Sequence, residues 1–571
     1  MKDEGVWSRA SGRGLSRRRL LGSAAAGGAT IAGLALAGCG GKTAGTAKSG
    51  ASGAASKTPQ RGGTLTLSEN FQRGFDPHIL QATDTGMFGL FYSMLIRANP
   101  TTYEIEPDLA AKWEVPSQTE LVFTLAPNIK WQDKAPASGR PLKVDDIISS
   151  YKRIQTNDPK FINKAYLSSV DKMEAVNDTT LKLTLKSPDV TQLGNLAVFS
   201  MKILNPEVVE KAAGKFPAAE SCVGTGAFVL QATEQNVGST LVRNPAYFKP
   251  GLPYLDQINL KAFGAGTTDF EAEWAAFIAG QIDYRWVPGQ DSQKFEAEKK
   301  GQYDLGWTGD QIYFITQAQT QKKPWDDPRL QRAMRLLIDH KEFRDQWATT
   351  WFGRGRYSAI FGTATADVWD LSEDEYGKYL EFKQPKDDAN KEAVQLLSAA
   401  GYTKDKPLKF TLAGTSGNGY QSEMTQLAQA QYKKGSQGAL DMDIKLFPTA
   451  EWATTRAQGN FEYYIGGHSS GGLDPDTYFS STYKTGGGRN YGHMSDPKLD
   501  AMIDKQRTLF DENERKKAVR DIIIYMMDTC PFGSAVPNYI LTATPPKLRN
   551  FPGQGPTFKW GDHYENIWLN R

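Results

Sequence analysis

The chain has 571 residues, which is too long for one hydrophobic core and predicts two or three lobes. Its hydrophobic content of 39% and aromatic content of 11% are typical of a globular protein with substantial cores. The net charge of +3 comes from the N-terminus, because residues 1–38 carry six Lys or Arg and two Asp or Glu, which leaves about −1 for the rest. This balance excludes the strongly basic surface expected of a nucleic-acid-binding protein.

The N-terminus has the pattern of an export signal. The segment SRRRLL, residues 16–21, precedes a run rich in Gly and Ala that ends in LAGC at Cys39. This resembles a twin-arginine signal peptide, residues 1–38, joined to a lipoprotein box in which Cys39 carries the lipid. A basic tail or a transmembrane anchor fits less well, because the apolar run is short and weakly hydrophobic. Residues 39–60 are expected to form a flexible tether, since their Gly, Ala, Ser, Thr and Lys cannot bury a core.

The first predicted elements are a strand and a loop. From Arg61 the chain reads GGTLTLSENFQRGFDPH, an alternating strand followed by a loop that carries Asn70 and Phe71. Apolar residues at helical spacing predict a helix over residues 144–154. Alternating patterns predict strands over residues 120–125 and 179–186.

The second half alternates helices and strands. Asp326 or Asp327 is expected to cap a helix that has Pro328 in its first turn. Further helices are expected at 388–400, 420–434 and 449–458, and strands at 408–413, 442–447 and 461–465. Two more helices are expected after Ser495 and Asp511. This alternation predicts an α/β unit with a largely parallel sheet.

The strand expected over residues 461–465 leads directly into a glycine-rich loop, Gly466 to Gly472. Such glycines would leave bare backbone N–H groups at the carboxyl end of a strand, where α/β sheets usually bind ligands. Residues 467–471 also match the G-x-S-x-G pattern of serine hydrolases, with Ser469 as the nucleophile. That nucleophile must lead into a helix, whereas Gly471, Gly472 and Pro475 disfavour one. A ligand-binding loop is therefore favoured over a catalytic one.

Metal and disulfide chemistry have little support. The five histidines have no metal-ligand spacing and no cysteine lies near them, so no metal and no cofactor is expected. Cys222 and Cys530 could pair in an exported protein, or could equally be buried thiols.

Several blocks in a fixed order resemble the large solute-binding proteins of ABC importers, the dipeptide- and oligopeptide-binding family. They include PDLAAKW, FTLAPNIKW, VGTGAFVL, FIAGQIDYRW and DPKLDAMIDKQRTLF, and the resemblance covers roughly residues 61–545. It implies an α/β, two-lobed periplasmic-binding-protein-like fold of type II, cluster C, with an inserted third lobe and a hinged cleft. Lobe I would comprise residues 61–83, 195–318 and 530–571, the inserted lobe II residues 84–194, and lobe III residues 319–529. Crossings near residues 313–319 and 530–536 would form the hinge.

The same resemblance implies the function. The protein would be an extracytoplasmic, lipid-anchored binding component that captures an oligopeptide-like solute between lobes, delivers it to an ABC permease with its ATPase, and performs no chemistry. An oligosaccharide or another non-peptide solute is the alternative ligand. A secreted serine hydrolase using Ser469, and a receptor that senses a ligand without transport, also remain open. We expect a monomer that binds no nucleic acid and lies on the outer face of the cytoplasmic membrane.

The residues expected to line the cleft are Asn70, Phe71, Tyr313, Trp452, Arg456, His468, Ser469, Ser470, Gly471 and Asp474. Structural roles compete with this interpretation, since a Trp that opens a helix often packs in a core and a helical Arg is usually solvated. Tyr313 at the crossing could equally belong to the core of the hinge.

Two loop positions depart from the family. Peptide binders commonly have Trp at the position of His468 and Asp at the position of Gly471, and that Asp pairs with the α-ammonium of the peptide. A buried ammonium without a carboxylate would cost several kcal/mol, which argues against ordinary capture of a free N-terminus. Asp474 or Asp476 could substitute, although both also fit the turn around Pro475. The 13 tryptophans would suit stacking on a sugar.

Overall fold

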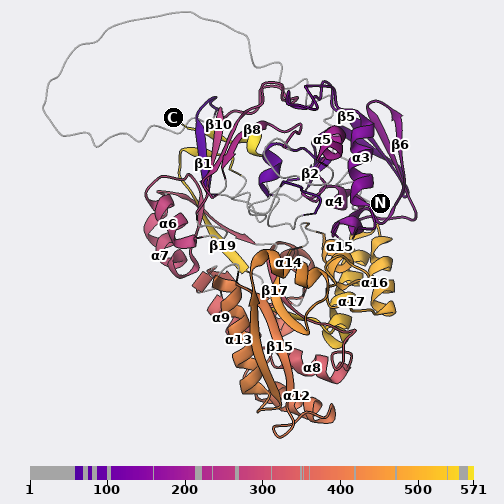
Figure 1. The fold of residues 1–571 in the computed structure, drawn as a ribbon, viewed down its shortest axis with the longest axis vertical. Helices are drawn as coiled ribbons and strands as arrows, with labels where there is room; N and C mark the ends of the chain where they lie inside the picture. Colours follow the sequence, from indigo (N-terminus) through magenta and orange to yellow (C-terminus); the bar gives the residue numbers. More distant parts are fainter. Residues whose placement is uncertain are drawn as a thin grey trace, which may run out of the picture.

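The computed structural model describes residues 58–68, 75–79, 86–99, 104–158, 160–212, 222–234, 236–263, 269–309, 312–347, 350–351, 353–358, 360–416, 419–469, 472, 474–535, 538–551 and 563–570. Figure 1 shows an upper lobe and a tapering lower lobe, joined on one side by β19 (Asn538–Thr544). Among the described residues no helix is long and apolar enough to cross a membrane. The export signal, Cys39 and most of the tether lie outside the described residues.

The upper lobe contains two four-stranded sheets. The first has the order β1 (Thr64–Ser68), β10 (Gln257–Lys261), β9 (Gly238–Arg243), β8 (Phe228–Glu234), with only the β1 and β10 pair parallel. The second is antiparallel, with the order β4 (Ala110–Ser117), β5 (Glu120–Leu125), β7 (Thr180–Leu185), β6 (Val170–Asn177). One hydrophobic cluster includes Leu65 of the first sheet and Leu121 of the second, so the segments expected as lobes I and II share a core.

Shorter elements complete the upper lobe. Two small ribbons pair β2 (Ile96–Ala98) with β3 (Ile105–Pro107), and β20 (Leu548–Arg549) with β21 (Trp568–Leu569). The helices are η2 (Gly86–Leu90), α3 (Val144–Ile154), η3 (Lys164–Leu167), α4 (Gln192–Leu196), α5 (Pro206–Lys211) and η9 (Tyr564–Asn566).

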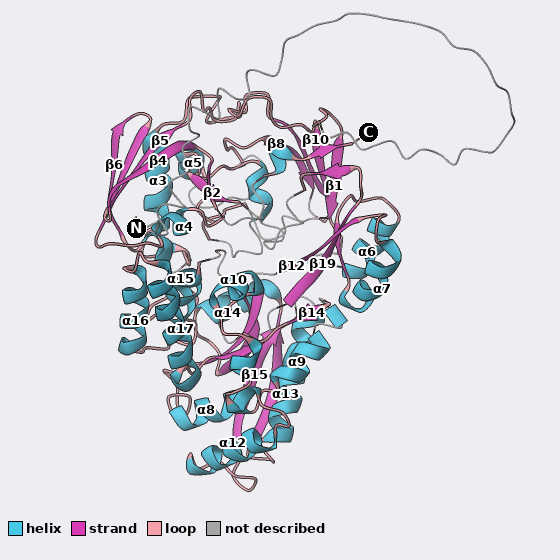
Figure 2. Ribbon diagram, turned by 180° about the vertical axis from the view of Figure 1, so that it is seen from behind, coloured by secondary structure: helices cyan, strands magenta, loops and turns pink. Residues whose placement is uncertain are grey.

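A third sheet lies at the junction of the lobes (Figure 2). Its order is β11 (Arg285–Val287), β19, β12 (Asp304–Gly309), and β14 (Arg354–Gly355) also pairs with β19. Helices α6 (Phe270–Ile278) and α7 (Gly289–Lys299) pack against it around Phe277 and Phe295.

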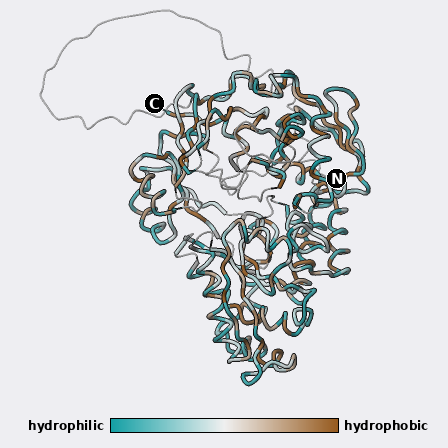
Figure 3. Tube along the Cα trace, in the orientation of Figure 1, coloured by the Kyte–Doolittle hydropathy of each residue, from teal (hydrophilic) through white to brown (hydrophobic). Residues whose placement is uncertain are grey.

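The lower lobe is built on a five-stranded sheet. Its order is β16 (Leu440–Phe447), β15 (Leu408–Thr415), β17 (Tyr463–Ser469), β13 (Ile312–Ala318), β18 (Gly533–Ala535). Only β13 runs against the other four strands, which confirms the largely parallel sheet expected for this region. Neighbouring side chains of β13 pack on opposite faces of the sheet, since Phe314 and Ile315 belong to different hydrophobic clusters. Figure 3 shows hydrophobic stretches along these strands.

The helices of the lower lobe cover both faces of that sheet. They are α8 (Pro328–Leu336), α9 (His340–Trp347), α10 (Thr363–Trp369), α11 (Glu373–Tyr376), η6 (Leu380–Phe382), α12 (Asp387–Ala399), α13 (Gly419–Gly435), α14 (Thr449–Ala457), α15 (Pro475–Tyr478), η7 (Phe479–Tyr483), α16 (Pro497–Arg507) and α17 (Glu512–Thr529).

Local capping explains where the helices begin. The Asp327 side chain accepts from the backbone N–H of Arg329 at the start of α8, and Pro328 occupies the first helical position. Asp496 and Asp511 cap α16 and α17 in the same way, as the sequence predicts. The stop after α12 is also confirmed, with Gly401 at a φ of +94°, a conformation that favours glycine.

Besides its excursion to β14, the chain connects the lower sheet directly with β12 and with β19 of the junction sheet. One passage lies between Gly309 of β12 and Ile312 of β13, and the other between Ala535 of β18 and Asn538 of β19. Because β12 pairs with β19 and β13 pairs with β18, the strands that flank the two passages lie side by side. We call these four strands the crossing ribbon.

Candidate functional site

The carboxyl end of β17 differs from the expectation of a strand that ends at Ile465. The strand continues to Ser469, and residues 466–469 pair with residues 312–315 of β13, Tyr313 lying opposite His468. The expectation of bare backbone is therefore wrong on the β13 side, because the partner strand forms a ladder that overrides the low strand propensity of glycine.

His468 lies at this end of β17 and is buried. Its ring stacks on Tyr464 with centroids 6.0 Å apart, and its Nε2 shares a 2.5 Å hydrogen bond with the Tyr464 hydroxyl. Burial lowers the pKa of His468 well below its usual value, and the guanidinium groups of Arg456 and Arg489 lower it further. The imidazole is therefore neutral at pH 7 and serves as a hydrogen-bonding group, not as a cation.

Trp452 packs inside the lower lobe behind His468. It is only 4% exposed and belongs to a cluster with Phe447, Phe461, Tyr464 and Tyr491. Its ring stacks on Phe447 at 5.7 Å and meets Tyr464 edge-on at 5.2 Å. In this structure Trp452 supports the site from within.

Arg456 is buried, in contrast to the solvated arginine usual on a helix. Only 5% of it is exposed, and its guanidinium carbon lies 4.7 Å from the ring centroid of Tyr491. Its Nη1 donates a long hydrogen bond of 3.4 Å to the Gly467 carbonyl, while Nε has no hydrogen-bond partner among the described residues.

Arg489 is a second buried arginine in the same region, and sequence reasoning missed it. It is 3% exposed and donates to the Tyr166 hydroxyl at 3.4 Å and to Asn163 Oδ1 at 3.3 Å, both in the upper lobe. Neither Arg456 nor Arg489 forms an ion pair within the described part of the chain.

The acidic residues of the following turn are already paired. Asp474 caps α15 and accepts from both terminal nitrogens of Arg515, at 2.8 and 2.6 Å. Asp476 is fully buried and accepts from Arg507 at 2.9 and 2.8 Å and from Gln506 at 2.7 Å. The structure therefore gives both carboxylates arginine partners in place of the ligand ammonium considered from the sequence.

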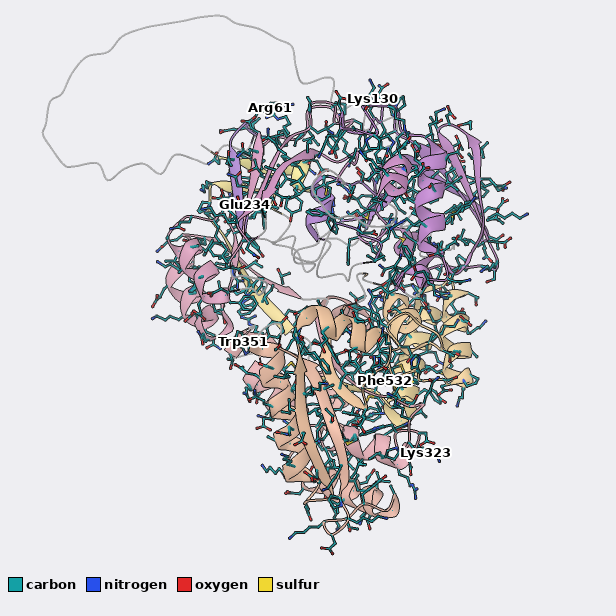
Figure 4. The ribbon with its side chains drawn as sticks, in the orientation of Figure 1. Arg61, Lys130, Glu234, Lys323, Trp351 and Phe532 are labelled. Atoms are coloured by element: carbon teal, nitrogen blue, oxygen red, sulfur yellow. The ribbon has the colours of Figure 1, made fainter. Side chains whose placement is uncertain are left out.

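Four half-buried aromatic side chains meet where the lobes join, and we call them the junction aromatics. Phe270 of α6 lies 5.5 Å from Trp286 of β11, 6.3 Å from Trp351 and 6.2 Å from Tyr420 of α13, measured between ring centroids. Trp351, labelled in Figure 4, donates to Glu423 at 2.8 Å. Their positions in sequence are far apart, so no local pattern could have grouped them.

On the other side of the molecule the lobes meet through polar groups. The Arg507 carbonyl accepts from the Val190 backbone N–H at 2.8 Å, and Arg507 Nη1 donates to the Ser168 hydroxyl at 3.4 Å. Figure 1 shows α14, which carries Trp452 and Arg456, at the end of the lower lobe that faces the upper lobe, between these two contacts.

Four of the predicted site residues, Asn70, Phe71, Ser470 and Gly471, lie outside the described residues. The backbones of Tyr313 and Ser469 are paired in the sheet at the register given above.

The described residues around Ser469 differ from a serine nucleophile elbow. Ser469 is the last residue of β17 and the next described helix, α15, begins at Pro475, whereas the nucleophile of such an elbow lies on a sharp turn that leads directly into a helix. Within the described ranges no three His, Cys, Asp or Glu side chains gather as metal ligands. Cys222 and Cys530 are buried thiols in separate clusters and do not form a disulfide.

Comparisons with known proteins agree with this architecture. The chain is 26% identical over 471 residues to the periplasmic oligopeptide-binding protein OppA of Salmonella typhimurium, covering 78% of this chain and 81% of that protein. The solved structure of Haemophilus influenzae OppA with the peptide RPPGFSPFR superposes with a TM-score of 0.76 at 18% identity, covering 91% of this chain and 100% of that one. The binding protein AgaA of A. tumefaciens R10 with agropinic acid gives 0.74 at 22% identity, covering 89% and 99%.

These likenesses confirm the two-lobed binding-protein fold and the resemblance noted in the sequence. The family profile described as bacterial extracellular solute-binding proteins, family 5 (Middle), matches residues 104–490, well over half of the chain. The chain therefore belongs to the family 5 extracellular solute-binding proteins.

Proposed function

We propose that this protein is the lipid-anchored, extracytoplasmic binding component of an ABC importer. It captures an oligopeptide-like solute between its lobes and delivers it to the permease, and it performs no chemistry on the solute. The lipid on Cys39 and the tether of residues 39–60 keep the folded lobes near the membrane. The division into lobes given from the sequence is part of the proposal, although β13 and β18 of the lower sheet lie just outside the limits of 319 and 529 given for lobe III.

The crossing ribbon is the observation that carries it. Paired strands flank both passages, which is the arrangement of a hinge about which two lobes can close over a solute with little disturbance of either core. Helix α14 lies at the end of the lower lobe that such closure would bring against the upper lobe (Figure 1).

The junction aromatics favour a second candidate for the ligand. Half-buried rings from both lobes, as in Trp286 and Trp351, provide flat surfaces that stack on a sugar as readily as on a peptide side chain. The relatives also differ in their ligands, since OppA was solved with a peptide and AgaA with agropinic acid. An oligosaccharide or other non-peptide solute therefore remains the alternative.

Thermal unfolding against panels of short peptides and oligosaccharides tests both candidates. A solute at a hundred times its Kd adds about 2.7 kcal/mol of stability, which moves the transition clearly. Small-angle scattering of the same samples should show a smaller radius of gyration when the lobes close. A response to sugars with silence from every peptide would replace the first candidate by the second, and binding without compaction would contradict closure.

The junction aromatics can be tested in the same assay. Trp351→Ala should weaken binding of a solute that stacks there, because it removes one ring of the group. Trp113→Ala, in the outer sheet of the upper lobe, is the matched control and should leave binding unchanged.

Anchoring and catalysis need separate tests. Cys39→Ala should release the exported protein from the membrane fraction, and retention of that variant would argue against a lipid anchor. Ser469→Ala should have no effect on ester hydrolysis by the purified protein, whereas loss of a measurable activity would support the hydrolase alternative.

A further inference from the structure

Two buried arginines near His468 have no carboxylate partner within the described part of the protein. Arg456 is 5% exposed and Arg489 is 3% exposed, and the hydrogen bonds that their guanidinium groups donate to neutral oxygens are 3.3 Å or longer. A guanidinium cannot lose its charge in a protein, so burial leaves it charged. A buried charge without a counter-charge is strongly unfavourable.

The other buried arginines of the lower lobe each bind a carboxylate. Arg515 holds Asp474 through two bonds, Arg507 holds Asp476, and Arg335 holds Glu381 at 2.9 and 2.8 Å. Arg456 and Arg489 therefore differ from their neighbours in lacking an anion.

Both guanidinium groups lie near His468, since the charge of each lowers the pKa of its imidazole. The Arg456 guanidinium lies over the Tyr491 ring, the His468 ring lies 5.6 Å from the same ring, and Arg489 is two residues from Tyr491. The Tyr491 ring stabilises the charge of Arg456 in part, because a cation is attracted to the face of an aromatic ring. The Nε–H of that guanidinium still has no hydrogen-bond acceptor among the described residues.

The sequence adds an independent observation. Position 471 is glycine, where peptide binders of this family commonly have an aspartate, and the nearby Asp474 and Asp476 are occupied by arginines. The site therefore has an excess of buried positive charge and offers no described carboxylate to a cationic ligand.

We infer that the solute is anchored by a carboxylate that Arg456 and Arg489 bind beside His468, and not by an α-ammonium. The inference rests on the proposed function and specifies its substrate class as carboxylate-bearing solutes. A carboxylate accepts two parallel N–H donors, which matches the unused donors of a guanidinium. Neutral His468 adds a hydrogen-bonding group without adding charge.

The first test measures the ligand-free protein and needs no known solute. Arg456→Met removes an uncompensated charge, so its melting temperature should equal or exceed that of the wild type. Arg335→Met is the matched control, because it removes the two short bonds of Arg335 to the buried Glu381 carboxylate and leaves it only Arg332 at 3.2 Å, so this variant should melt at a lower temperature. A drop for Arg456→Met as large as that for Arg335→Met would show that Arg456 is a structural cation, and the inference would be overturned.

The second test uses tri-alanine as the free acid, the C-terminal amide, the N-acetyl acid and the N-acetyl amide. The two acids should raise the melting temperature and the two amides should not. Arg456→Met and Arg489→Gln should weaken binding of the acids by about ten- to a hundredfold, as expected for loss of a charge-assisted hydrogen bond. Lys409→Gln, which removes an exposed charge of the same lobe, should have no effect.

The outcomes separate the inference from the proposed function. If N-acetylation abolishes binding and amidation does not, the ligand is held by its ammonium and the inference fails. If cellotriose binds with equal affinity to wild type and Arg456→Met and compacts the protein, the proposed function stands and the inference fails. If none of the four peptides binds, the melting temperatures of ligand-free Arg456→Met and Arg335→Met decide whether Arg456 is a structural cation.

Discussion

Acidification should destabilise the upper lobe through one histidine. His78 is fully buried, its Nδ1 accepts from Arg153 at 3.0 Å, and its Nε2 donates to the Lys202 carbonyl at 2.8 Å. Burial lowers the pKa of His78 to about 4, and Arg153 lowers it further while Asp76 opposes the shift. The folded protein therefore keeps this imidazole neutral where the unfolded chain, with an ordinary histidine pKa near 6.5, takes up a proton.

The sign and size of the effect follow from that difference. Stability is unaffected by this group above about pH 6.5 and falls as the pH drops toward 4, because only the unfolded state binds the proton. A shift of about 2.5 units corresponds to roughly 3 kcal/mol at pH 4. Burial also lowers the pKa of His340 and His468, so their contributions have the same sign.

Urea unfolding at pH 7, 6, 5 and 4 measures this contribution when wild type is compared with His78→Gln. Glutamine keeps a donor and an acceptor but does not titrate. The free energy of unfolding of the variant should therefore fall by roughly 3 kcal/mol less than that of the wild type between pH 7 and 4. Carboxylate protonation affects both proteins equally and cancels in the comparison. Equal losses in the two proteins, or an NMR titration of His78 near pH 6.5, would refute the reasoning.

Three further predictions concern stability and reactivity. Asp476→Ala should cost about 3–5 kcal/mol in urea unfolding, because it leaves the buried Arg507 unpaired, and Asp476→Asn should cost less because it keeps hydrogen-bond acceptors. Cys530 should resist iodoacetamide at pH 8 in the folded protein, since burial raises the pKa of its thiol to about 12, and rapid alkylation without urea would contradict this. Gly224→Ala should unfold or distort the upper lobe, because the added Cβ would lie 1.8 Å from the Phe91 carbonyl oxygen, and an unchanged melting temperature would disprove that packing.

The elements that could be predicted from sequence are those with local signals. Helix α8 begins where Asp327 and Pro328 indicate, and α3 has the limits that its apolar spacing predicts. The end of β17 could not be predicted, because it depends on pairing with β13, which is distant in sequence. Glycine propensity pointed to a loop, and a partner strand overrode it.

The residues of the candidate site could be predicted only in part from the sequence, for a similar reason. His468 and Arg456 could be named as candidates from the sequence. The burial of Arg456 could not be predicted, because it packs on Tyr491, which is distant in sequence. Arg489 could not be predicted because its partners Asn163 and Tyr166 belong to the other lobe. Contacts between distant segments decide which polar residues become a site.

Strand β13 belongs to two structures at once, since it forms the crossing ribbon with β18 and the ladder that holds the end of β17. Tyr313 pairs with His468 only a few residues from the point where the chain leaves the lower sheet. Under the proposed function, a solute bound at this end of β17 would therefore act on the same strand that leads into the crossing ribbon. A membrane partner that contacts both lobes would sense the bound solute through their relative orientation alone.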